Sequence, residues 1–127
     1  ITVHTDSHSQ SGLVAQRVLQ EEGADLTKVV IGHSGDTTDL DYLMKLADAG
    51  SILGMDRFGL DIFLPFEDRI NTIVTLAERG YADRMVLAHD AACFSDWCCP
   101  EVICTYRSLY NVKLVARSNE GASASRC

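Results

Sequence analysis

Short apolar runs alternate with longer segments of helical periodicity along the first 90 residues. The apolar runs are rich in β-branched and aliphatic residues and predict strands near residues 1–4, 28–33, 51–56 and 84–89. Three segments between them have apolar residues at helical spacing and end at a glycine, namely residues 10–23, 37–50 and 66–80. The pattern is strand, helix, strand, helix, strand, helix, strand, which is typical of parallel β-α units with right-handed crossovers.

Each predicted helix has a face that we expect to pack on the sheet. The expected inward-facing residues are Leu13, Val14, Val18 and Leu19 in the first helix, Leu40, Leu43, Met44 and Ala47 in the second, and Ile70, Ile73, Val74 and Ala77 in the third. The predicted strands are almost entirely apolar, so both of their faces should be covered in the folded protein.

Polar side chains interrupt these strands only where the strands end. His4, His33 and Asp56 close the first three strands, and the pair His89 and Asp90 closes the fourth. The carboxyl ends of parallel strands meet at one edge of the sheet, where α/β proteins place ligands and catalytic groups. We therefore expect a functional site at this edge.

Two α/β architectures fit the repeated strand-helix pattern. An open doubly wound sheet would be complete with four or five strands, whereas a (β/α)8 barrel needs about twice the number found here. The sequence contains neither GxGxxG nor GxxxxGK[ST], so the usual nucleotide-binding forms of the open sheet lose support. The chain also starts within a strand, at "ITVH". We therefore predict the C-terminal half of a TIM barrel, with about strands 5–8.

Composition and charge narrow the class of protein. The chain has 127 residues, 46% of them hydrophobic and 23% charged, which fits one globular domain. A net charge of −7 argues against nonspecific nucleic-acid binding. No apolar run is long enough for a membrane span, and no signal peptide is visible, so we expect a cytoplasmic protein. The five cysteines all lie after residue 92 and lack a CxxC spacing, which favours reduced thiols.

The residues at the strand ends suggest a metal site. Neutral imidazole nitrogens and a carboxylate are common ligands of zinc and similar divalent ions, and His4, His33 and Asp90 would supply them. Any one such histidine is more often a capping or packing residue, and the case depends on all three sharing one edge. We interpret His8 as a solvated loop residue. Strand alternation directs His89 away from Asp90, so we interpret His89 as a packing residue or as a residue that supports a ligand, and not as a ligand itself.

We interpret Asp56 differently from the other residues at the strand ends. A carboxylate in this position more often holds a neighbouring arginine, here Arg57, or backbone amides than a metal ion.

Four motifs in order resemble the phosphotriesterase family of the amidohydrolase superfamily. They are "VHTDSHSQSG", "VVIGHSGDTTDLDYL", "GSILGMDRFGLD" and "MVLAHDAACFSDW", and the resemblance runs from residue 1 to about residue 97. The resemblance implies a (β/α)8 barrel with two divalent metal ions, usually zinc, although manganese, cobalt or iron would also suit the ligands.

The resemblance also implies roles for individual residues. It makes His4 and His33 ligands of the more exposed metal, and Asp90 a ligand of the buried metal that also shuttles the proton. It places Arg57 and the stretch from Cys93 to Trp97 on substrate-binding loops. The implied activity is hydrolysis of lactones, phosphotriesters or related esters through a metal-bound hydroxide, and the motifs resemble the lactonase branch more closely.

Some parts of the family pattern have no counterpart in this chain. The HxH pair of the first strand and the bridging lysine of the fourth fall outside it, so the isolated chain should bind metal poorly and be inactive. Residues 98–127 show no clear amphipathic period and are expected to form a divergent or irregular tail. The alternative hypothesis is a catalytically inactive half-barrel or an α/β binding module. We expect a small-molecule substrate, and the full-length protein could be a homodimer.

Overall fold

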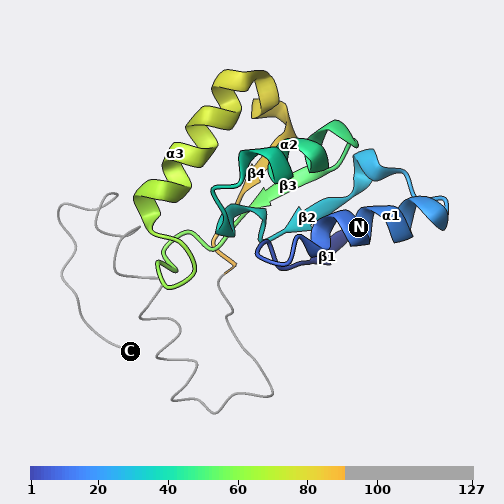
Figure 1. Cartoon of the computed structure of the whole chain (residues 1–127), viewed down its shortest axis with the longest axis horizontal. Helices are drawn as coiled ribbons and strands as arrows, with labels where there is room; N and C mark the ends of the chain where they lie inside the picture. Colours follow the sequence, from blue (N-terminus) through green and yellow to red (C-terminus); the bar gives the residue numbers. More distant parts are fainter. Residues whose placement is uncertain (91–127) are drawn as a thin grey trace, which may run out of the picture.

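The computed structural model describes residues 1–90, so Cys93, Trp97 and the predicted tail at 98–127 lie outside the described residues. Its centre is a parallel sheet with the strands in sequence order (Figure 1). The strands are β1 (Thr2–His4), β2 (Val30–Gly32), β3 (Ile52–Met55) and β4 (Met85–Leu87). Val3 pairs with Ile31, and Leu53 pairs with Ile31 on one side and Met85 on the other. The predicted order of parallel neighbours is therefore confirmed.

Helices connect each pair of consecutive strands. They are α1 (Ser11–Glu21), α2 (Leu40–Asp48) and α3 (Phe66–Leu76). In Figure 1, α1 and α2 lie in front of the sheet and α3 stands beside α2. Shorter turns of 3₁₀ helix occupy Leu26–Lys28, Ser34–Asp36 and Ala82–Arg84, and a π turn at Ala77–Tyr81 follows α3. Parallel strands in sequence order, joined by right-handed crossovers, bring successive helices to one face of the sheet.

The hydrophobic core lies between the helices and the sheet. Its buried residues are Leu26, Val29, Ile31, Tyr42, Leu43, Leu46, Ala47, Leu53, Met55 and Leu76. Ile31 and Leu53, a pair on adjacent strands, are fully buried in the same core cluster as Leu43 and Leu46 of α2. In the part of the chain that the structure describes, no helix has the length and apolar character needed to cross a bilayer.

The expected faces of α1 and α3 are partly wrong. Val14, Val18 and Val74 are each about half exposed, while Gly12 and Gln16 of α1 and two polar residues of α3 are buried instead. Gln16 can be buried because its amide donates hydrogen bonds to the Leu46 carbonyl at 2.8 Å and the Ser51 hydroxyl at 2.7 Å. Apolar periodicity misses such positions, since it assumes that buried side chains are apolar.

The crossing of α1 over α2 depends on the absence of a side chain at Gly12. A Cβ there would overlap the Tyr42 hydroxyl and lie 3.0 Å from Ile31 Cγ2. Overpacking of this kind costs about 1–3 kcal/mol, which exceeds or offsets the ~1 kcal/mol that alanine gains over glycine within a helix. We expect Gly12→Ala to lower the free energy of unfolding, measured by urea denaturation of the chain.

The matched control for Gly12→Ala is the same substitution in a Tyr42→Phe background. There the overlap with the hydroxyl is gone, so Gly12→Ala should be close to neutral or stabilising. Equal destabilisation in both backgrounds would show that Tyr42 does not set the spacing of the two helices.

Candidate functional site

The carboxyl ends of the four strands form one edge of the sheet, which we call the rim. It consists of residues 4–5, 32–36, 55–57 and 87–90. All four strands run in the same direction, so the polar residues that end them are brought to this edge. The rim holds the sequence-predicted residues His4, His33, Arg57 and Asp90.

His4 and His33 point ring nitrogens at each other. The distance from His33 Nε2 to His4 Nδ1 is 3.1 Å, and the two rings meet edge to face with centroids 4.3 Å apart. Two imidazole nitrogens on one tetrahedral zinc ion, each bound at about 2.0–2.1 Å, are separated by roughly 3.3 Å. The pair therefore has the spacing and the donor chemistry of two ligands of one metal ion.

Asp56 fixes the orientation of the His33 ring. Its Oδ2 accepts the backbone N–H of His33 at 3.0 Å, and its Oδ1 lies 2.9 Å from His33 Nδ1. A carboxylate accepts hydrogen bonds, so in the neutral ring of His33 Asp56 favours the tautomer with its proton on Nδ1, which leaves the lone pair of Nε2 facing His4. Carboxylates that hold metal-binding histidines play this same part. The bond to a backbone amide was expected for Asp56, whereas its hold on the imidazole was not, and the carboxylates that bind Arg57 are Asp36 and Asp90 instead.

Two glycines near the Asp56 carboxylate lie close to backbone carbonyls of the neighbouring strands. A Cβ on Gly32 would lie 2.9 Å from the Val3 carbonyl oxygen, and one on Gly54 would lie 3.0 Å from the Ile31 carbonyl oxygen. Both would also come within 3.8 Å of Asp56 Oδ2. A side chain at either position would therefore press on a backbone carbonyl of the neighbouring strand, next to the carboxylate that orients His33.

Asp90 lies beside the other ring nitrogen of His33 and is held by Arg57. Asp90 Oδ2 is 3.8 Å from His33 Nδ1 and 3.2 Å from Arg57 Nε. Arg57 Nη1 also binds Asp36 Oδ2 at 2.7 Å. Partial burial works against the charged guanidinium, but the two carboxylates outweigh it and hold the pKa of Arg57 above its usual value. The rim thus carries an arginine fixed between two acidic side chains.

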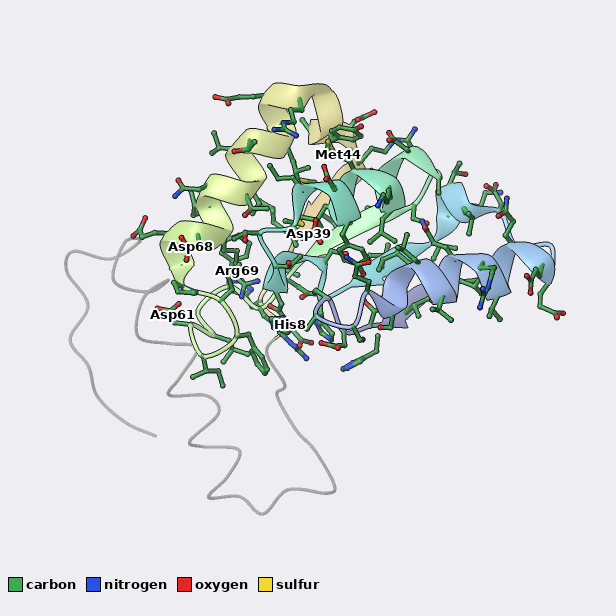
Figure 2. The ribbon with its side chains drawn as sticks, in the orientation of Figure 1. His8, Asp39, Met44, Asp61, Asp68 and Arg69 are labelled. Atoms are coloured by element: carbon green, nitrogen blue, oxygen red, sulfur yellow. The ribbon has the colours of Figure 1, made fainter. Side chains whose placement is uncertain are left out.

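Asp36 and Arg69 are rim-associated residues that the sequence reasoning missed. Asp36 is buried in the 3₁₀ turn after β2, and Arg69 is 1% exposed on α3 (Figure 2). Their ion pair joins Asp36 Oδ1 and Arg69 Nη1 at 2.9 Å. The available signal was an arginine at the inward position of α3, next to Ile70 and Ile73, but charged residues are rarely buried unless paired. The partner was not identifiable from spacing alone.

Three of the rim residues adopt left-handed backbone conformations. The φ angles are 62° at His33, 59° at Arg57 and 55° at Asp90. Non-glycine residues adopt this conformation only where surrounding contacts hold them, and such residues are often found at functional sites. Each of the three has the side-chain contacts described above, which supply that restraint.

Other residues considered in the sequence lie outside this constellation. His8 is exposed in the loop after β1 (Figure 2), and His89 lines a cavity of about 280 Å³. The other residues around that cavity are Phe58, Phe66, Ile70, Leu87 and Ala88. Cys93 and Trp97 are beyond the described residues. Among residues 1–90, no group of three or more His, Cys, Asp or Glu side chains is arranged to hold a metal ion.

Comparison with known proteins shows the family to which the chain is similar. The sequence model of the phosphotriesterase family matches residues 1–114. The chain belongs to the phosphotriesterase family. The match extends past residue 97, the predicted end of the resemblance. A "Phosphotriesterase homology protein" of Mycobacterium tuberculosis is 55% identical over 96 residues, which are 76% of this chain and 29% of the relative. An "Aryldialkylphosphatase" of Saccharolobus solfataricus is 47% identical over 97 residues, covering 76% of this chain and 31% of the relative.

Solved structures of the phosphotriesterase family show the same fold. The phosphotriesterase from M. tuberculosis matches with a TM-score of 0.78 and 46% identity, over 93% of this chain and 38% of that one. A mutant organophosphorus hydrolase from Deinococcus radiodurans matches with a TM-score of 0.60 and 33% identity, over 64% of this chain and 25% of that one. These neighbours are TIM barrels, and this chain is an α/β unit with a parallel sheet. It spans less than a third of the curated relatives quoted above.

Proposed function

We propose that this chain supplies about strands 5–8 of a barrel hydrolase of the phosphotriesterase family. The proposed enzyme hydrolyses lactones or phosphotriesters with the help of divalent metal ions, most simply zinc. The single observation that carries this proposal is the convergence of His4 Nδ1 and His33 Nε2, 3.1 Å apart, with His33 held by Asp56. A merely structural pair of histidines does not require a carboxylate that fixes one ring with its lone pair directed at the other.

His4 and His33 would hold one metal ion, and the remaining ligands would come from outside the described residues. A bound divalent ion lowers the pKa of water toward neutrality and polarises the substrate oxygen. This division explains why residues 1–90 alone contain no complete metal site.

Asp90 is proposed as the group that accepts the proton from the attacking water. Its carboxylate lies beside His33, and its bond to Arg57 leaves it on the same rim as the histidine pair. A positioned carboxylate that takes up a proton in the transition state is a general base. Asp90 would also be a ligand of the second metal ion.

Arg57 and the loop that follows it are proposed to contact the substrate. Arg57 lies over the ring of Phe63, with its Cζ 4.4 Å from the ring centroid, and the neighbouring Ile62 is 71% exposed. Exposed apolar side chains beside a polar site are typical of a substrate-binding wall. This supports a substrate that has an apolar substituent next to its ester or phosphoryl group.

A chimera tests this function. The matching segment of the S. solfataricus aryldialkylphosphatase would be replaced by the corresponding residues of this chain. We expect the purified chimera to hold divalent metal and to hydrolyse diethyl 4-nitrophenyl phosphate or a lactone. The unaltered aryldialkylphosphatase is the positive control. A chimera that melts cooperatively yet holds no metal and hydrolyses neither substrate would overturn the proposal and favour an inactive module.

A further inference from the structure

Arg69 is the largest fully buried side chain of the described residues, and the proposed chemistry does not use it. It comes from α3, which also contributes Leu76 to the hydrophobic core and packs Ile73 against it. A buried guanidinium has lost its contacts with water, and it is tolerated only where protein acceptors replace them. The identity of those acceptors therefore indicates what Arg69 does.

The acceptors of Arg69 come from two different loops of the rim. Its Nη1 donates hydrogen bonds to the carbonyl of Gly35, after β2, and to the carbonyl of Asp56, after β3, the latter at 2.8 Å. The same nitrogen forms the ion pair with Asp36. A Cβ on Gly35 would lie 2.9 Å from this nitrogen, so the loop has space for the guanidinium only because residue 35 is glycine. One side chain thus ties α3 to the ends of two adjacent strands.

Two of the three contacts of Arg69, those with Asp56 and Asp36, connect it to residues of the proposed site. Asp56, whose carbonyl Arg69 holds, is the residue whose carboxylate orients the His33 ring. Asp36, whose Oδ1 Arg69 holds, binds Arg57 through its other oxygen, and Arg57 binds Asp90. Alternating charges therefore run from Arg69 through Asp36 and Arg57 to Asp90.

We propose that Arg69 is a positioning residue that holds His33 and Asp90 in their working orientations without touching the substrate. It acts on His33 through Asp56 and on Asp90 through Asp36 and Arg57. The expected effect on catalysis depends on the proposed hydrolase function, whereas the effect on the orientation of His33 does not. The alternative is that Arg69 only stabilises the packing of α3.

The test compares Arg69→Met and Arg69→Lys in the chimera. Methionine keeps an unbranched apolar stem but removes all donors. Because Nη1 alone makes the three contacts, the ammonium of lysine, with three donors, should restore part of the function. Arg79→Met, in the turn after α3, is the matched control because Arg79 lies outside the rim.

We expect Arg69→Met to lower kcat or metal affinity by about 10–100-fold, the usual effect of losing a group that supports metal ligands, while KM changes much less. We expect Arg69→Lys to recover part of this loss and Arg79→Met to behave like the parent chimera. Activity and metal affinity of Arg69→Met equal to those of Arg79→Met would overturn the proposal. If Arg69→Met does not fold, the kcat of Arg69→Lys tests the proposal in its place. Reduced kcat in a folded protein supports positioning, whereas full activity or failure of both variants to fold contradicts it.

A second measurement does not depend on activity. In metal-free protein labelled with ¹⁵N-histidine, the Nδ1 proton of His33 should be visible at low field, because Asp56 accepts it. The signal should be lost or broadened in Arg69→Met and retained in Arg79→Met. An unchanged signal would overturn the proposal. A chimera that lacks activity but shows the expected loss would contradict the hydrolase function while supporting the role of Arg69.

Discussion

Replacing Asp90 with asparagine in the chimera is expected to lower kcat by about 10²–10⁴, the range usual for general acid–base groups. Asparagine keeps the shape of the side chain but removes its negative charge and its ability to accept a proton. It also weakens the contact with Arg57 Nε, which is 3.2 Å from the carboxylate. The measurement is steady-state hydrolysis of diethyl 4-nitrophenyl phosphate and of a lactone, with metal content determined on the same samples.

The control for this experiment is Asp83→Asn, which makes the same change at an exposed position near the opposite end of β4. It should leave kcat unchanged. If Asp90→Asn kept both its metal content and its full activity, Asp90 would not be the proton acceptor. If it lost metal and activity together, the ligand role of Asp90 would account for the effect.

Replacing His33 with alanine is expected to reduce metal content and to lower kcat by roughly 10³-fold. The loss of a metal ion removes several kcal/mol of transition-state stabilisation, and about 1.4 kcal/mol corresponds to a tenfold change in rate. Substitution of His33 should reduce metal content and kcat more than substitution of most histidines would. The reason is that its ring contacts both His4 and Asp56, and its removal disrupts both contacts. Metal analysis and hydrolysis rates measure the two parts of the effect.

His8→Ala is the matched control, since His8 is an exposed histidine of the loop that follows β1. It should keep the metal content and the activity of the parent chimera. Loss of metal from His8→Ala, with metal retained in His33→Ala, would show that the histidines had been assigned the wrong way round.

The strands and their order were predictable from the sequence because each strand is a short apolar run that ends in a polar residue. The predicted runs at 28–33 and 51–56 enclose the observed β2 and β3, and the same polar ends identified the rim. The family resemblance was also confirmed. Strand ends carry this information because direction in a parallel sheet fixes which edge their side chains reach.

The contacts that connect the rim residues were not predictable. Asp36 lies in a turn of the kind that usually holds solvated side chains, and Arg69 has inward helical spacing but carries a charge that is typical of exposed residues. They can be buried because they pair with each other across 33 residues of sequence. Apolar periodicity does not indicate which acidic and basic side chains form such an ion pair. The same reason explains Gln16, whose partners Leu46 and Ser51 are 30 and 35 residues away along the chain.

The glycines beneath Asp56 have a consequence for how this sequence can vary. Gly32 and Gly54 carry no reactive group, yet any side chain there would press on a backbone carbonyl of the neighbouring strand. In a saturation library selected for hydrolysis, these two positions should be as intolerant as the histidines themselves. The lack of space for a side chain at these two positions would then restrict sequence variation in the family as strongly as the need for reactive side chains does. An engineer who redesigns the substrate loops should leave both glycines untouched.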